Sequence, residues 1–160
     1  MNPILTIFNN RLHRDKVISL WKEVFGYEAD HNVPQLVIDK KLEFGDGLFF
    51  IAQNNKDVIG TIMAGYDGHR GWIYSIAVSP NFQKQGIGFS LLTFAERRLS
   101  ELGCMKINLQ IMEGNEAVEN FYLSNGYQTE KRISMGKCLP ENISNTEQTR
   151  GADGVVRRYV

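Results

Sequence analysis

A single α/β domain, in which helices pack on a mixed β-sheet, is predicted by three observations. The chain has 160 residues, 42% of them apolar, which suits one domain with a buried core. Apolar residues recur at helical spacing near the N-terminus and then form three short runs separated by turn residues. Strand-like and helix-like segments alternate after that, which is typical of a partly parallel sheet.

The N-terminal part predicts one strand and two helices. Residues 4–8 are β-branched or aromatic, as in strands. A helical spacing follows, and Gly26 would end that helix. The residues that share its apolar face are Val17, Ile18, Trp21, Val24 and Phe25. Pro34 suits the first turn of a second helix, with Ile38 and Leu42 on one face and Gly45 at its end.

The middle of the chain predicts an antiparallel meander. Three apolar runs, at residues 48–52, 58–66 and 72–78, are separated by turn-forming residues at 54–57 and 67–71. Trp21 and Trp72 are expected to lie in the core, because large aromatic side chains usually do.

The remaining pattern predicts helix, strand, helix, strand. A long helix is expected from about residue 86 to 102, followed by Gly103 as its cap. Its inner face would carry Ile87, Leu91, Ala95, Leu99 and Leu102. A strand at 106–112, a short helix at 115–124 and a strand at 127–137 complete the order β-α-α-β-β-β-α-β-α-β. The strand-helix-strand unit over 72–112 should be parallel.

The sequence predicts one domain over residues 1–138 and a separate tail over residues 139–160. The tail begins polar and ends in the partly apolar run 155–160. It is expected to be either a disordered terminus or an extra edge strand, which could pair with a second subunit. A homodimer is therefore one possible assembly.

Composition excludes several classes of protein. Eighteen basic and eighteen acidic residues give a formal net charge of zero, which argues against nucleic-acid binding. No apolar run reaches the length of a membrane span, and the first residues lack the pattern of a signal peptide, so a cytoplasmic protein is expected. The two cysteines, Cys104 and Cys138, and the scattered histidines have no metal-ligand spacing, and no metal site is predicted.

The segment with the clearest chemistry follows the third run of the meander. The strand ends at Pro80, a short loop contains Lys84, and Gly86 and Gly88 open the long helix. Unpaired backbone N–H groups and the positive end of the helix dipole favour an anion there, and glycines let a phosphate approach closely. A Walker loop is excluded because no Gly-Lys-Ser/Thr ending follows, and a dinucleotide fingerprint lacks its third glycine at Leu91.

Two motifs in register resemble the GNAT superfamily of N-acetyltransferases. Gln83, Gly86 and Gly88 match its Gln/Arg-x-x-Gly-x-Gly/Ala signature at a helix start. Asn115, then Tyr122 seven residues on, then Gly126 before an aromatic residue match its second signature. The resemblance covers residues 48–137, and the segment 66–71 further resembles the YpeA-type branch of small bacterial acetyltransferases.

The resemblance implies an acyl-CoA N-acyltransferase fold, with acetyl-CoA as cosubstrate in a cleft between two splayed parallel strands. It implies that backbone groups of Ile76, Ala77 and Val78 bind the pantetheine, and that Asn115 contacts the CoA arm. The loop and helix start would hold the pyrophosphate through Gln83, Lys84, Gln85, Gly86, Ile87, Gly88 and Phe89.

The resemblance also implies transfer of acetyl to a primary amine by direct attack in a ternary complex. Tyr122 would protonate the leaving thiolate, and its alternative role is that of a core aromatic beside Val118 and Phe121. The general base stays open, because Gln110 stands where some relatives carry a glutamate. Other groups considered for it are Glu113, Glu28, Asp67, His69 and a water chain past Tyr74, and an amine of low pKa would need none.

The acceptor amine, on a small molecule or a peptide, is expected between the irregular stretch 27–33 and the turn 67–71. Its candidate residues are Glu28, Asp67, His69 and Tyr74. Glu28, Asp30 and Asp67 would suit a cationic amine, or they are ordinary solvated loop residues. The alternative function is a non-catalytic acyl-CoA-binding or regulatory module on the same fold.

Overall fold

The computed structural model describes residues 2–26, 33–137 and 139. The chain divides into two compact units, Met1–Gln110 and Ile111–Val160, which are described separately below. The expectations for the stretch 27–32, with Glu28 and Asp30, for Cys138 and for residues 140–160 lie outside the described residues.

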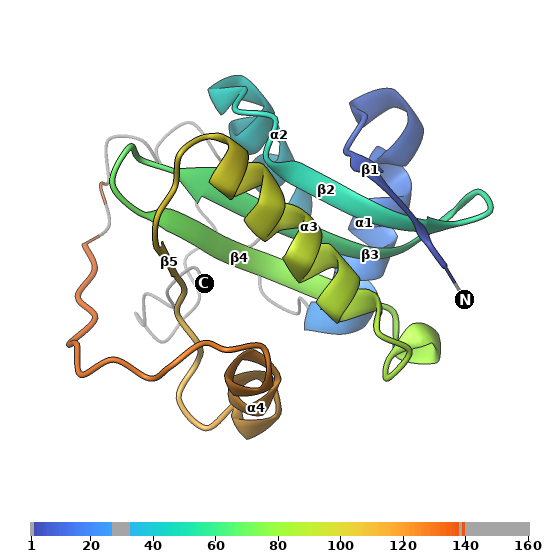
Figure 1. Cartoon of the computed structure of the whole chain (residues 1–160). Coiled ribbons are helices and arrows are strands. Elements are labelled where there is room, and N and C mark those ends of the chain that lie inside the picture. Colours follow the sequence, from blue (N-terminus) through green and yellow to red (C-terminus); the bar gives the residue numbers. More distant parts are fainter. Residues whose placement is uncertain (1, 27–32, 138, 140–160) are drawn as a thin grey trace, which may run out of the picture. The chain divides into compact units, whose positions relative to one another are not determined.

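The first unit contains a five-stranded mixed sheet (Figure 1). Its strands are β1 (Ile4–Ile7), β2 (Phe49–Asn54), β3 (Asp57–Tyr66), β4 (Gly71–Val78) and β5 (Ile107–Asn108), in that spatial order. Neighbouring strands from β1 to β4 are antiparallel, and β4 and β5 are parallel. The predicted meander and the predicted parallel unit are therefore confirmed.

Helices cover both faces of this sheet (Figure 1). α1 (Asn10–Phe25) and α2 (Pro34–Phe44) pack on one face, and the Trp21 indole of α1 donates a 2.8 Å hydrogen bond to Thr61 Oγ1 of β3. α3 (Ile87–Glu101) packs on the other face, where the Phe50 and Phe94 rings meet edge to face at 5.1 Å. Gly26 and Gly45, with φ of 57° and 69°, cap α1 and α2 as predicted.

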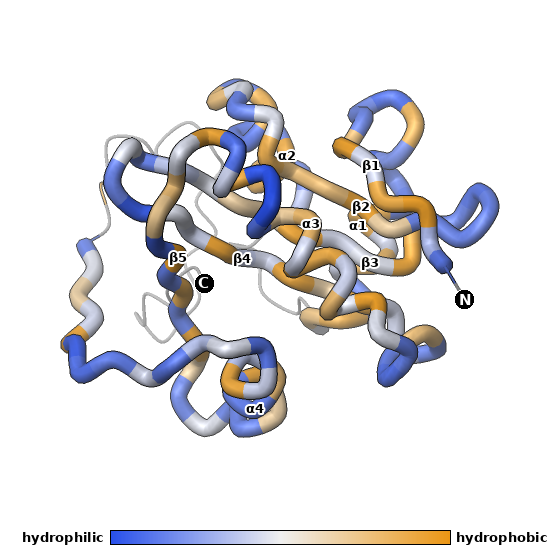
Figure 2. Tube along the Cα trace, viewed as in Figure 1, coloured by the Kyte–Doolittle hydropathy of each residue, from blue (hydrophilic) through white to orange (hydrophobic). Residues whose placement is uncertain are grey.

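Apolar side chains between the helices and the sheet form the core. The α1 side of the sheet buries Phe8, Val17, Ile18, Leu20, Trp21, Ile38, Phe49, Ile51, Val58, Met63 and Ala77 in one cluster. β2 is hydrophobic along most of its length, while the turn between β2 and β3 is hydrophilic (Figure 2). The apolar runs read from the sequence at 48–52 and 58–66 thus correspond to strands that are buried on both faces of the sheet.

Four positions predicted on apolar faces or in the core are wrong. Leu42 is 39% exposed, Leu102 is 55% exposed, and Phe25 and Trp72 are each 38% exposed. Leu102 is the C-cap residue of α3, so it has left the helical face that its spacing suggested. Trp72 lies near the start of β4, where its indole N–H donates to Asp67 Oδ2 at 3.3 Å.

Two predicted strands differ in the structure. β5 is limited to Ile107–Asn108, because its ladder with β4 ends at the Trp72–Asn108 pair, just before β4 bends. Residues 127–137 form no strand, so the last strand of the predicted order is absent from the described residues. The side chains of Ile133 and Met135 are each 90% exposed, so the apolar residues of this segment do not pack on a sheet or helix.

The second unit contains α4 (Glu116–Ser124). Asn115 begins this helix, and its Oδ1 accepts a hydrogen bond from the Val118 backbone N–H at 3.3 Å. Glu116 and Glu119 in the first turn complement the positive end of the helix dipole. Among the residues that the structure describes, no helix has both the length and the apolar composition needed to cross a membrane.

Candidate functional site

The β4 strand carries a bulge where the resemblance places the pantetheine. Met63 of β3 pairs with Tyr74, but Thr61 pairs with Ala77, so β4 has one extra residue across this interval. Ser75 in the bulge has a φ of 52°, a left-handed conformation that few non-glycine residues adopt. A bulge bends its strand and re-aims the groups that follow.

The bulge lies beyond the parallel ladder between β4 and β5. That ladder consists of the pairs Gly71–Ile107 and Trp72–Asn108. Ile76, Ala77 and Val78 come later in β4, so their β5-side edge lies outside the ladder. Such an edge can bind the amides of an extended ligand, and it agrees with the splayed strands that were expected.

The loop after β4 is closed by its own side chains. A short 3-10 turn, η1 (Pro80–Phe82), follows Ser79. The Gln83 side-chain amide donates to the Val78 carbonyl at 3.1 Å, and that of Gln85 donates to the Asn81 carbonyl at 3.3 Å. Gln83 is thus tied to the end of β4, which gives the first residue of the family signature a structural role.

The N-terminus of α3 has the form of an anion site. Gly86 is its N-cap with a φ of 80°, and no side chain caps the helix. The first α-helical bond runs from Ser90 N to Gly86 O at 2.9 Å, so the N–H groups of Ile87, Gly88 and Phe89 precede it. A Cβ atom added at Gly86 would meet nothing within 4 Å, and the exposed Lys84 adds positive charge in the same loop. These groups can hold a phosphate.

The motif residues of the second unit lie at the start and near the end of α4. Asn115 uses its side-chain oxygen as the helix cap. Tyr122 is 5% exposed, and its ring lies 5.1 Å from that of Phe121 and 5.3 Å from that of Tyr127. Burial raises the pKa of Tyr122 to about 12, so the phenol keeps its proton at neutral pH. Tyr122 is therefore a buried aromatic residue that is protonated at neutral pH, so its packing does not exclude a role as an acid.

Asp67 organises the turn between β3 and β4. Its Oδ1 accepts hydrogen bonds from the backbone N–H groups of His69 and Arg70, at 2.7 and 2.6 Å. These bonds and the Trp72 indole hold the pKa of Asp67 below its usual value, because they favour the ionised form. Asp67 is thus a weak base. His69 Nε2 lies 2.9 Å from the Arg70 guanidinium in the same turn.

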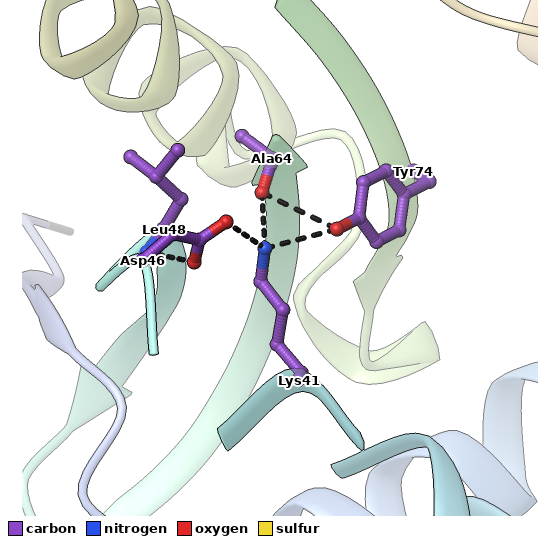
Figure 3. A network of polar contacts seen from close by, with 5 residues as sticks. All are labelled: Lys41, Asp46, Leu48, Ala64 and Tyr74. Atoms are coloured by element: carbon purple, nitrogen blue, oxygen red, sulfur yellow. Dashed lines mark hydrogen bonds and ion pairs between the residues drawn. The ribbon is translucent and has the colours of Figure 1, made fainter. Parts of the chain in front are cut away.

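The hydroxyl of Tyr74 belongs to a buried polar network that the sequence did not predict (Figure 3). The Lys41 ammonium, on a side chain only 7% exposed, donates to Tyr74 Oη at 2.9 Å, to Asp46 Oδ2 at 2.7 Å and to the Ala64 carbonyl. One signal could have found it. Lys41 follows Pro34 and Ile38 at i+7 and i+3, so it shares their inner face of α2.

Glu113 and Cys104 are the remaining titratable residues considered from the sequence. Glu113 is exposed in a turn, and Cys104 is half-buried with its thiol 3.3 Å from the Lys106 carbonyl. Within residues 2–26, 33–137 and 139, no group of three His, Cys, Asp or Glu side chains is placed to hold a metal ion.

Comparisons with known proteins agree with this geometry. The profile of the acetyltransferase (GNAT) family matches residues 14–127. An acetyltransferase of Pectobacterium atrosepticum is 38% identical over 128 residues, which are 80% of this chain and 90% of the relative.

Solved structures match the fold at lower identity. The aminoglycoside acetyltransferase AAC(6')-Iy, in complex with a bisubstrate analogue of CoA, matches with a TM-score of 0.70 and 17% identity over 87% of this chain and 99% of its own. The PaiA N-acetyltransferase of Thermoplasma acidophilum, in complex with coenzyme A, matches with a TM-score of 0.69 and 17% identity over 83% of this chain and 94% of its own. The match of the family profile over most of the chain, the 38% identity and the shared fold show that this chain is an acetyltransferase of the GNAT family.

Proposed function

We propose that this acetyltransferase moves the acetyl group of acetyl-CoA to a primary amine, on a small molecule or a peptide, by direct attack in a ternary complex. The observation that carries the proposal is the uncapped N-terminus of α3, with Gly86 open to solvent beside Lys84. The family's use of acetyl-CoA and the bulged β4 strand support it.

In this proposal the first unit binds the cosubstrate. Backbone groups of Ile76, Ala77 and Val78 hold the pantetheine amides. N–H groups from Lys84 to Phe89 hold the pyrophosphate, while the Gln83 side chain fixes the loop to β4. Asn115 contacts the CoA arm through its side-chain amide, whose oxygen also caps α4.

The chemistry then needs few protein groups. The bound thioester supplies an activated acetyl carbon. The neutral amine nitrogen adds to this carbon to form a tetrahedral oxyanion, whose collapse then breaks the carbon–sulfur bond. A backbone N–H near Val78 stabilises the oxyanion. Tyr122, which is protonated at neutral pH, gives its proton to the departing sulfur. Burial raises its pKa to about 12, which makes it a weaker acid than an exposed tyrosine. A cationic amine loses one proton before it attacks, and its nitrogen loses a second after the carbon–nitrogen bond forms; both protons end in solvent water. Asp67, with its lowered pKa, is a poor base for these transfers, and no general base is assigned among the remaining candidates.

For the acceptor side we propose the turn 67–71 and the stretch 27–33, with Glu28, Asp67, His69 and Tyr74. The ionised Asp67 supports a cationic amine as acceptor. AAC(6')-Iy holds an analogue of an acetylated aminoglycoside amine, and its fold is similar. The segment 66–71 supports membership of the YpeA-type branch, and a homodimer remains part of the proposal, to be checked by light scattering.

The first experiment is calorimetric titration of the protein with acetyl-CoA. Gly86→Glu places a carboxylate where the phosphates would lie, so we expect at least a 100-fold loss of affinity, and Lys84→Glu should weaken binding to a smaller extent. Gly103→Glu is the matched control, because Gly103 has a similar φ of 88° and nothing within 4 Å of an added Cβ. Absence of binding by folded wild-type protein would contradict the proposal.

The second experiment measures CoA release across a panel of small amines and peptides. Tyr122→Phe should lower kcat by roughly 100-fold while leaving the Kd of acetyl-CoA unchanged, as expected for the loss of a general acid. Binding of acetyl-CoA without CoA release on any acceptor would favour the non-catalytic module instead.

A further inference from the structure

Lys41 is a buried cation whose three protons all have acceptors. It lies in the last turn of α2, and its acceptors come from the loop before β2, from β3 and from β4: Asp46, the Ala64 carbonyl and Tyr74 (Figure 3). Asp46 also accepts from the Leu48 backbone N–H at 3.0 Å, which fixes the carboxylate. A network this fully satisfied holds its members in one arrangement.

Tyr74 is the member of the network that lies in β4, two residues before the segment 76–78 proposed to bind the pantetheine. Its hydroxyl accepts from Lys41 at 2.9 Å and donates to the Ala64 carbonyl at 3.3 Å, while its ring lies 5.3 Å from the ammonium. The side chain is only half-buried, so apolar packing alone does not fix it. Its two hydrogen bonds fix the orientation of the ring.

Because Tyr74 comes directly before the bulge of β4, fixing its ring also affects the residues that follow the bulge. Tyr74 is the last residue of β4 in register before the bulge, where Ser75 takes its left-handed φ of 52°. Ile76, Ala77 and Val78 follow directly. The direction in which their amides point depends on how firmly the strand is held at Tyr74.

We propose that Lys41 is a positioning residue, whose ammonium fixes Tyr74 and thereby holds β4 at the start of its bulge. The amides of residues 76–78 are then preorganised for the pantetheine and the oxyanion. This proposal rests on the proposed function, because that function gives these amides their ligand.

The test uses the full chain with Lys41→Met and Asp46→Asn combined. This pair removes both charges together and so leaves no unpaired buried ion, while the amide oxygen introduced by Asp46→Asn can still accept from the Leu48 N–H. The matched control is Lys40→Met, since Lys40 is 69% exposed and pairs with Glu43 on the surface. Tyr74→Phe is the second variant, which leaves the ion pair in place.

Two measurements are made on each variant. Amide hydrogen exchange of the peptide covering 73–78 should be at least tenfold faster in the double variant, and the Kd of acetyl-CoA should rise about tenfold. Tyr74→Phe should show changes at least as large, because it removes both hydrogen bonds of the hydroxyl, and the triple variant should be no worse than Tyr74→Phe alone, because Lys41 acts through that hydroxyl. Lys40→Met should match the wild type.

Three results would overturn the proposal. The first is a folded double variant whose hydrogen exchange and acetyl-CoA affinity equal those of the wild type. The second is a Tyr74→Phe variant that behaves like the wild type while the double variant is impaired. The third is a triple variant whose losses are the sum of those of the double variant and Tyr74→Phe. If the double variant does not fold, Tyr74→Phe decides alone. If wild-type protein does not bind acetyl-CoA, the proposed function fails, and the exchange of residues 73–78 still decides whether Lys41 holds β4.

Discussion

Ser75 holds a backbone conformation that is unfavourable for a residue with a Cβ atom. Its φ is 52°, at the bulge of β4. A left-handed conformation costs an L-residue roughly 1–2 kcal/mol, and glycine avoids most of this cost while losing some entropy on folding. We therefore expect Ser75→Gly to raise the free energy of unfolding by about 0.5–1 kcal/mol, measured by urea denaturation.

The matched control for Ser75→Gly is Ser19→Gly, at an exposed position inside α1. There glycine should lower the free energy of unfolding by about 1 kcal/mol, since the native φ already suits serine. A loss of stability at both positions would mean that the Ser75 side chain makes a contact worth more than its strain.

His13 makes stability depend on pH. Its Nδ1 accepts the Asn9 backbone N–H at 2.9 Å, and burial, with a smaller contribution from Lys16, lowers the pKa of the imidazole below 6.5. The unfolded chain therefore binds a proton more readily than the folded one as pH falls below 6.5. The stabilisation is complete above pH 6.5 and is lost as pH falls through the folded pKa.

His13→Gln separates this effect from other titrations, because a Gln oxygen can accept the same N–H without titrating. Urea unfolding at about pH 7.5 and about pH 5.0 should show a smaller loss of stability for the variant than for the wild type. Equal losses in both proteins would show that the pKa of His13 is the same folded and unfolded.

At the scale of elements, α3 packs tightly against the sheet at Gly60. A Cβ atom added there would lie 2.9 Å from Leu91 Cδ1, 3.1 Å from the Ala77 carbonyl oxygen and 3.3 Å from Ile87 Cγ2. Two of these contacts are side chains of α3, but the carbonyl is backbone of β4 and cannot rotate away. The one missing side chain thus lets Ile87 and Leu91 of α3 lie against β3 beside the Ala77 carbonyl of β4.

Gly60→Ala should therefore push α3 away from β3. We expect a loss of about 1–3 kcal/mol in the free energy of unfolding, which is typical of overpacking, and weaker acetyl-CoA binding in calorimetry. Gly136→Ala is the control, because an added Cβ there meets nothing within 4 Å. Unchanged acetyl-CoA affinity in a destabilised Gly60→Ala protein would separate packing at Gly60 from the cosubstrate site.

The elements that sequence could predict were those with a local cause. Glycines at a helix start and a run of apolar residues act through their immediate neighbours, so the loop 83–88 and α3 were predicted within a residue or two. The length of β5 and the absence of a strand at 127–137 depend on partners that alternation does not reveal. Ser75 had no signal, because the bulge arises from register between two strands.

At the scale of the whole molecule, a net charge of zero gives no indication that Lys41 is buried. A lysine on a helix usually points to solvent, and only the positions of Asp46, Ala64 and Tyr74 make burial favourable here. The three come from parts of the chain that are distant in sequence from Lys41 or reached through a turn. The candidate cosubstrate residues were predicted by motif, whereas the residues that support them required the folded chain.

The position of the buried apolar side chains along the described part of the chain carries the last prediction. All buried apolar side chains of the described residues lie between Phe8 and Tyr122, and the family profile ends at residue 127. We propose that residues 139–160 are a tail outside the acetyltransferase domain. Removing them should change Tm by no more than about 2 °C and leave the Kd of acetyl-CoA unchanged, because no described core contact is lost.

A shorter chain provides the comparison. Truncation after Ser124 also removes Tyr127, whose ring lies 5.3 Å from Tyr122 and whose N–H bonds the Tyr122 carbonyl at 3.1 Å. That chain should melt at a clearly lower temperature, since the end of α4 loses its capping contacts. A fall in Tm of more than about 5 °C on removing residues 139–160 alone, which corresponds to about 1–2 kcal/mol, would instead mean that the tail packs as an additional element. A matching fall in mass by light scattering would identify it as an arm between two subunits.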